Sequence, residues 1–408
     1  MKLFAIKAQF FLSYGVLGSL APLLALILRD SKDFDARQIG ITLAASSIGM
    51  LFSPAIMTFL ADRNFDTRKI LRAIFLFTAI ALVAVYFLKD PIPITIAWAA
   101  YSIIFIPTLP LLDGYYFSSV REQGKPAGDQ PDSYQFIRAW GSAGFMVPAI
   151  ALFFILDSKT SAIQALWCAI TWCALAFAGT YYLHPCEIKQ PVTKQTPTRL
   201  AMRAMFSRTT LPMCAGLFLV YVGANCYYPY ISVFFSDEIG IDLKWIPMIS
   251  ALGVVIEIGY LLGLAPIRRL IKLKGIMVLG LGTMGARLAL LTVFPTTTVS
   301  LLIQLFHGLE ILAMFVVPVI YLDRVAGDSF RNSIQGAFTI VITVPARLIG
   351  FLLAGEIAHA YSSREVILTS ALLAFISMLL ILTCFKPSSS NIEVKNEPDG
   401  DLYNHGSD

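Results

Sequence analysis

The sequence predicts an all-α polytopic membrane protein whose 12 transmembrane helices form two six-helix bundles. Hydrophobic residues make up 57% of its 408 residues, charged residues only 14%, and the mean hydropathy is +0.72. A soluble chain of this length could not bury that much apolar surface. Apolar runs of about 20 residues, the length that spans a bilayer as a helix, recur twelve times along the chain.

Six of these runs predict a first bundle over residues 1–183. They cover residues 4–28, 39–61, 70–88, 94–118, 133–156 and 162–183. The first run carries Lys2 and Lys7 but is not followed by a small-residue cleavage site. We therefore expect it to remain as a helix and not to be removed as a signal peptide.

A polar stretch that contains three prolines, residues 184–208, separates the first six runs from the last six. This composition is typical of a linker between two bundles, here a cytoplasmic one. The second bundle is predicted over residues 209–385. Its runs cover residues 209–235, 245–266, 274–294, 297–322, 333–357 and 364–385. Residues 386–408 are polar and acidic, so we expect a disordered cytoplasmic tail.

Lys and Arg residues are three times as frequent in the connections on the side of the two termini as in the connections on the other side. The positive-inside rule then predicts that both termini are cytoplasmic, in the inner (plasma) membrane of a bacterium. The net charge of +5 is scattered over short loops and forms no continuous basic patch. This pattern argues against nucleic-acid binding.

The six cysteines and four histidines are dispersed, without metal-ligand spacing or an extracytoplasmic disulfide framework. We therefore expect free thiols, no metal and no cofactor other than a proton as coupling ion. The sequence also lacks the Gly-x-x-x-x-Gly-Lys-Ser/Thr stretch of an ATP site. Any work done by the protein must draw on a gradient.

Five ionisable side chains fall near the middle of predicted spans of the second half: Glu257, Arg287, His307, Glu310 and Arg347. A charge at the bilayer centre costs at least about 2.5 kcal/mol on insertion scales, so such residues usually face the protein interior and serve a function. With histidine neutral, two acids balance two arginines. A dry pocket favours a protonated carboxylic acid and a guanidinium favours the carboxylate, so relative movement of the two could load or release a proton. The alternative is a buried salt-bridge network that moves nothing.

The connection after the second run carries Asp62, Arg63 and Arg68 within the stretch 58–69. This stretch resembles the Gly-x-x-x-Asp-Arg-x-x-x-Arg-Lys motif of the major facilitator superfamily, although the first glycine is replaced. A weaker match to this stretch, Leu264 to Lys274, follows the second run of the other half. The resemblance implies two related bundles and a loop that gates without binding substrate; a generic positive-inside loop is the alternative.

A narrower resemblance, to the phenylpropionate-permease and lactose-permease branch of proton symporters, covers nearly the whole chain. The matching stretches are Ser13-Tyr14-Gly15, Pro110-Leu111-Leu112-Asp113, Arg138-Ala139-Trp140-Gly141-Ser142-Ala143-Gly144-Phe145 and Leu252-Gly253-Val254-Val255-Ile256-Glu257. The third stretch is the most specific of the four. The resemblance implies a proton-coupled transporter and a substrate site made by these helices.

The resemblance implies that Asp113 and Arg138 hold the solute, with Ser142 beside them. Both charges lie about two turns from the cytoplasmic ends of their spans, so they could also form a structural ion pair. Phe145 stands where lactose permease carries a tryptophan that stacks on the sugar. Loss of the indole donor leaves an apolar face, which favours an aromatic substrate, or simply core packing.

Lactose permease also uses a His-x-x-Glu pair on its tenth helix with an arginine on its ninth. The resemblance implies that Glu310 is the protonated carboxylate, that Arg287 modulates its proton affinity, and that His307 couples it to substrate. Glu257 is expected at the substrate, and Arg347 in an auxiliary role.

Tyr14 in the first run, and Asn225 with Tyr227, Tyr228 and Tyr230 in the seventh, suit a cavity that binds an amphipathic solute. Tyrosines are also ordinary membrane-interface anchors.

Together these features predict a monomeric secondary transporter that takes up a small organic solute with a proton by alternating access in the lipid bilayer. Sugars, nucleosides and aromatic acids stay open as solutes. The alternatives are a proton-driven exporter of amphipathic compounds and a non-transporting sensor. An enzyme is not expected, because the sequence contains no nucleophile constellation.

Overall fold

The computed structural model describes residues 2–52, 66–122, 131–157, 162–185 and 197–386, and its regular structure there is helical. Predicted features in the remaining residues, including Asp62, Arg63 and the tail 387–408, lie outside the described part of the chain. The disordered tail and the gating role of Asp62 and Arg63 therefore stay predictions.

The described part of the first half is built from a bent helix pair and six further helices. Its helices are α1 (Lys2–Leu20), α2 (Leu24–Leu26) with the π turn η1 (Ile27–Ser31), α3 (Ala36–Ala45), α5 (Thr67–Phe87), α6 (Pro91–Phe105), α7 (Thr108–Glu122), α8 (Pro131–Ile155) and α9 (Gln164–Gly179). Asp35 caps α3 in a capping box with Gln38, and Asp66 accepts a hydrogen bond from the first turn of α5. Caps of this kind begin the helices where the apolar runs begin.

The second half starts after an amphipathic helix in the predicted linker, α10 (Pro197–Met205), which packs on α17. Its helices are α11 (Leu211–Asp237), α12 (Trp245–Leu262), α13 (Leu264–Leu270), α14 (Leu273–Val293), α15 (Thr297–Leu302), α16 (His307–Ile311), α17 (Val317–Phe338), α18 (Val344–Ala360) and α19 (Ser363–Cys384). Short 3₁₀ or π turns join several of these helices, among them η4 (Ile303–Phe306), η5 (Leu312–Val316) and η6 (Thr339–Thr343).

Within the described residues, nine helices are long and apolar enough to cross a membrane, or ten if Phe4–Leu20 and Leu24–Ser31, bent by 47°, form one broken span. The second predicted span, 39–61, runs into residues that are not described. In the fifth, α8, residues Ala139–Ile155 make a shorter apolar helix. The described part of the chain is thus all-helical, and its long apolar helices are those of a membrane-spanning protein.

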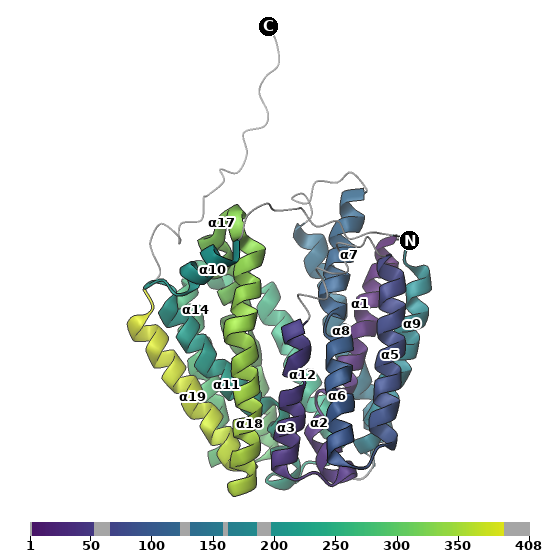
Figure 1. Ribbon diagram of the computed structural model, residues 1–408. Helices are drawn as coiled ribbons and strands as arrows, with labels where there is room; N and C mark the ends of the chain where they lie inside the picture. The colour runs from purple at the N-terminus through teal and green to yellow at the C-terminus, as the bar shows by residue number, and fades with distance from the viewer. Residues whose placement is uncertain (1, 53–65, 123–130, 158–161, 186–196, 387–408) are drawn as a thin grey trace.

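Helices of each half pack mainly on one another. In the first half α1 lies against α8 and α9, and in the second half α11 and α14 lie against α19. Figure 1 shows α5, α6 and α9 on the right and α14 and α19 on the left.

Glycines allow the tightest approach in the first half. A Cβ at Gly18 or Gly144 would collide with the backbone of Phe145 or Phe11 on the facing helix, so α1 and α8 touch backbone to backbone. This contact explains the glycines in the stretch 138–145.

The two halves meet at the end of the molecule opposite α10. Gly40 of α3 and Gly355 of α18 pack so closely that a Cβ on Gly40 would lie 2.9 Å from the Cα of Gly355. Beside them Arg37 pairs with Glu356 at 2.9 Å, and Arg29 pairs with Asp237. In Figure 1 this end, with α2, is at the bottom, and α10 is near the top.

Candidate functional site

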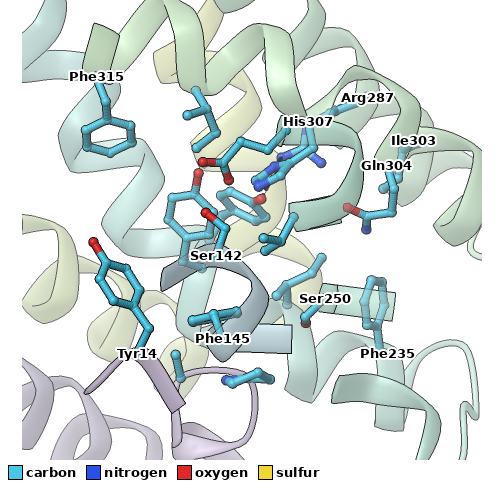
Figure 2. A pocket seen from close by; sticks show the side chains of 18 residues that line it. Tyr14, Ser142, Phe145, Phe235, Ser250, Arg287, Ile303, Gln304, His307 and Phe315 are labelled. Carbon is cyan, nitrogen blue, oxygen red and sulfur yellow. Dashed lines mark hydrogen bonds between the residues drawn. The ribbon is translucent and has the colours of Figure 1, made fainter. Parts of the chain in front are cut away.

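A cavity of about 400 Å³ lies between the two halves, a size suited to a small organic solute. Its described lining comes from α1 and the turn after it, from α8, α11, α12 and α14, and from the broken segment 303–315. The residues are Tyr14, Ala21, Pro22, Ser142, Phe145, Tyr227, Tyr228, Ile231, Phe235, Ser250, Val254, Glu257, Arg287, Ile303, Gln304, His307, Ile311 and Phe315. Figure 2 shows Tyr14, Ser142 and Phe145 toward its left side, and Gln304 and Phe235 at its right.

An ion pair between Arg287 and Glu310 forms the charged wall of this cavity. The Nη2 and Nε atoms of Arg287 lie 2.6 and 2.7 Å from Oε2 of Glu310. The side chain of Glu310 is fully buried and that of Arg287 is 3% exposed. Two charges at such depth are tolerated because they neutralise each other and share hydrogen bonds.

His307 and two tyrosines complete the hydrogen bonds of this ion pair. Nδ1 of His307 lies 3.0 Å from Oε1 of Glu310, and Tyr228 donates its hydroxyl to the same oxygen at 2.9 Å. Nη2 of Arg287 donates to the hydroxyl of Tyr227 at 2.5 Å. Glu310 therefore lies beside an imidazole, whose ring nitrogens can donate or accept a hydrogen bond. It also lies beside the Tyr228 hydroxyl, which can donate to the carboxylate or accept from the protonated acid.

The chain around this cluster is irregular. A 3₁₀ turn, Ile303–Phe306, ends just before His307, and a π turn, Leu312–Val316, follows the short helix that carries Glu310. Gly280 of α14 lies against the carbonyl of Leu309, since a Cβ there would meet that oxygen at 2.5 Å. This approach holds Arg287, two turns further along α14, at the carboxylate. Departures of this kind are frequent at functional sites.

The first half supplies the opposite wall. Tyr14 packs on Gly141, where a Cβ would lie 2.8 Å from the tyrosine ring, and Ser142 and Phe145 follow on the same helix. Glu257 of α12 also lines the cavity. The structure thus brings together nine residues that were predicted for substrate or proton. They are Tyr14, Ser142, Phe145, Tyr227, Tyr228, Glu257, Arg287, His307 and Glu310.

Four further predicted residues are not among the described lining. Tyr230 donates its hydroxyl to the carbonyl of Ala36 at 2.9 Å. Asn225 donates to the carbonyl of Tyr221 at 2.7 Å in its own helix. Arg347 donates to Ser46 of the first half at 3.2 Å and stacks on Phe351. Asp113 lies half-buried on α7.

The side chain of Arg138 lies outside the described part of the chain, as do Asp62 and Arg63. The third residue of the gating prediction, Arg68, forms an ion pair with Asp66 at 2.7 Å and reaches toward the carbonyl of Leu183. Its hydrogen bonds hold the pKa of Asp66 below the usual range.

Sequence reasoning missed several lining residues, above all Gln304, Ser250, Phe235 and Phe315. Only Gln304 carries a signal that could have been read, because it is a primary amide in the same apolar run as His307, three residues earlier. No group of three His, Cys, Asp or Glu residues with the geometry of a metal site occurs among the described residues.

Comparison with known proteins gives the family and the fold. A family model described as the MFS_1 like family matches residues 3–388. YegT of Escherichia coli (strain K12), provisionally named a nucleoside transporter, is 23% identical over 403 residues, which cover 90% of each chain. Xanthosine permease of the same organism is 21% identical over 377 residues, 88% of each chain.

Among solved structures, a mutant of the nucleoside transporter NupG aligns with a TM-score of 0.84 and 18% identity, covering 95% of this chain and 100% of that one. This likeness concerns the fold. The predicted resemblance to the major facilitator superfamily is confirmed by the family match and these relatives.

Proposed function

Because the chain belongs to the MFS_1 like family, we propose that it takes up a nucleoside together with a proton across the inner membrane of a bacterium. It is a membrane transporter of the major facilitator superfamily and not an enzyme. The single observation that carries the proposal is the cavity between the two halves with the Arg287–Glu310 ion pair in its wall.

The nucleoside class is favoured over sugars and aromatic acids by the relatives together with the lining. YegT and xanthosine permease, each similar over about nine-tenths of its length, carry nucleoside names. The cavity combines aromatic faces such as Phe145 and Phe235 with the polar groups of Ser142 and Glu257. A nucleoside needs both, since its base stacks on aromatic rings and its ribose hydroxyls bind acids and hydroxyls.

Proton coupling rests on the chemistry of Glu310. In the present arrangement the carboxylate is held by Arg287, which favours its charged form. If the guanidinium moves away as the halves rotate, a buried carboxylate without a countercharge takes up a proton. His307 contacts both Glu310 and the cavity, so bound solute can bias that exchange. No cofactor other than the proton is required.

The proposed architecture has 12 spans in two bundles of six, with both termini cytoplasmic and one chain as the transporting unit. Contacts between the halves gather at the end opposite α10, on the side that the positive-inside rule assigns to the exterior. We assign this arrangement to the inward-facing state of alternating access.

Uptake of labelled solutes by the purified full-length protein in liposomes tests the proposal. Uridine, inosine, xanthosine, lactose and phenylpropionate are offered with and without an inward proton gradient. Accumulation of a nucleoside that requires the gradient is expected. Accumulation of lactose or phenylpropionate alone would contradict the nucleoside class. Nucleoside loss from preloaded liposomes against an opposed proton gradient would support an exporter instead.

A further inference from the structure

Gln304 is a buried amide in the cavity wall that the proton cluster does not use. The residue is 8% exposed, and its Nε2 makes only a long contact, 3.4 Å, with the carbonyl of Ser300 one turn earlier. None of the hydrogen bonds found in the described chain ends on its Oε1. A primary amide carries two donors and one acceptor, so Gln304 can still accept at Oε1 and donate an N–H to a group in the cavity.

The residues around Gln304 could bind a flat ring that has hydrogen-bonding groups at its edge. Phe235, Ile303 and Ser250 line the same side of the cavity, and Figure 2 shows the amide of Gln304 turned toward its interior. Ser250 donates to the carbonyl of Ile246 in its own helix at 3.2 Å, so its oxygen can still accept. An aromatic face next to an amide can stack a flat ring and read its edge.

We propose that Gln304 is the specificity-determining residue of the nucleoside site, where its amide pairs with a base edge that carries an N–H beside a C=O. Such an edge occurs in uracil, hypoxanthine and xanthine. A primary amide presents one donor and one acceptor in a plane, the complement of that edge, and glutamine reads nucleobases in this bidentate manner elsewhere. This inference rests on the proposed nucleoside function.

The position of Gln304 also links base recognition to the proton cluster. Gln304 and His307 lie one turn apart and both face Gly253 of α12. A Cβ at Gly253 would lie 2.8 Å from Oε1 of Gln304 and 3.2 Å from Cδ2 of His307. The glycine leaves the amide room to turn toward a base, and a base held there lies beside the imidazole that contacts Glu310.

Displacement of labelled uridine and inosine from the full-length protein tests the pairing. Competitors are uridine against N3-methyluridine and inosine against N1-methylinosine, because each methyl group removes the N–H and leaves the ring. The wild type is expected to bind the unmethylated member about tenfold more tightly or better, the value of a lost bidentate contact. Gln304→Leu is expected to bind both members of each pair within about twofold.

The matched control is Gln335→Leu, since Gln335 donates to the carbonyl of Val319 and is not a lining residue of the cavity. It should keep the wild-type ratio. If Gln304→Leu fails to reach the membrane, Gln304→Met, which keeps the volume and loses the amide, makes the same test.

Persistence of the tenfold ratio in Gln304→Leu or Gln304→Met overturns the inference and leaves the nucleoside function standing. A wild type that binds uridine or inosine but does not distinguish the methylated forms has the same consequence. A wild type that binds no nucleoside refutes the proposed function, and this inference with it.

Discussion

At the scale of single residues, the account depends on the charge of Glu310. Its side chain has no contact with solvent and takes hydrogen bonds from Arg287 and Tyr228. Glu310→Gln should abolish accumulation driven by a proton gradient, because an amide cannot exchange the proton. Exchange of labelled for unlabelled solute, which needs no net proton movement, should persist. Uptake and exchange assays on the same liposomes separate the two.

Glu310→Gln also leaves Arg287 without a countercharge. Breaking a buried pair on one side costs about 3–5 kcal/mol, so the variant should melt at a lower temperature than the wild type. The double variant Arg287→Gln with Glu310→Gln should recover much of that loss and still fail to accumulate solute. A double variant that accumulates solute would show that these two residues only hold helices together.

Tyr228 gives a smaller and separable effect. Tyr228→Phe removes one hydroxyl bond to Glu310 and keeps the ring, which lies 6.4 Å from that of His307. A single hydrogen bond is worth about 0.5–1.5 kcal/mol, so gradient-driven uptake should fall several-fold without being lost. Tyr182→Phe, at an exposed tyrosine, is the control. Equal uptake by all three proteins would remove Tyr228 from the mechanism.

The sequence could reveal those site residues whose side chains are costly to place inside a membrane. Placing an ionisable side chain in an apolar span costs free energy, so the sequence alone identifies Arg287, His307 and Glu310 as candidate functional residues. A primary amide is uncharged, so Gln304 gives only a weaker signal, its place three residues before His307 in the same apolar run. A phenylalanine gives none, and nothing in the sequence distinguishes Phe315 from a packing residue.

At the scale of elements, helix positions were predictable because apolar length and caps define them. The breaks were only partly predictable. The bend after Leu20 lies at Pro22, and the π turn after Ile311 is followed by Pro318; proline is a frequent cause of such departures. The 3₁₀ turn Ile303–Phe306 contains no proline that would have revealed it.

The α3–α18 contact makes a prediction about an element pair. A Cβ on Gly355 would lie 2.9 Å from the carbonyl oxygen of Ala36 and 3.0 Å from the Cα of Gly40, so Gly355→Ala must separate the two helices. Uptake should fall markedly, and cysteines placed near this end should react faster with a water-soluble maleimide. Gly336→Ala, where a Cβ meets nothing within 4 Å, should leave both measurements unchanged. The same labelling rate in both variants would contradict the claim that the α3–α18 contact closes this end of the molecule.

At the scale of the whole molecule, helix packing between α3 and α18 should contribute more to holding the two halves together than the surface ion pairs beside it. Arg37 and Glu356 are about half exposed, and an exposed pair contributes roughly 0.2–1 kcal/mol. Arg37→Ala should therefore change uptake by only a few-fold or less, and less at high salt. An effect larger than that of Gly355→Ala would mean that charge, and not packing, holds the halves together.

Solute-driven proton movement tests the central claim most directly. Energy-depleted cells that express the full chain are placed in weakly buffered medium, and the external pH is recorded as uridine, inosine or xanthosine is added. Symport predicts immediate alkalinisation by at least one nucleoside, and none with Glu310→Gln. Nucleoside entry into wild-type cells without a pH change, or alkalinisation that persists in Glu310→Gln, would contradict proton coupling through this carboxylate.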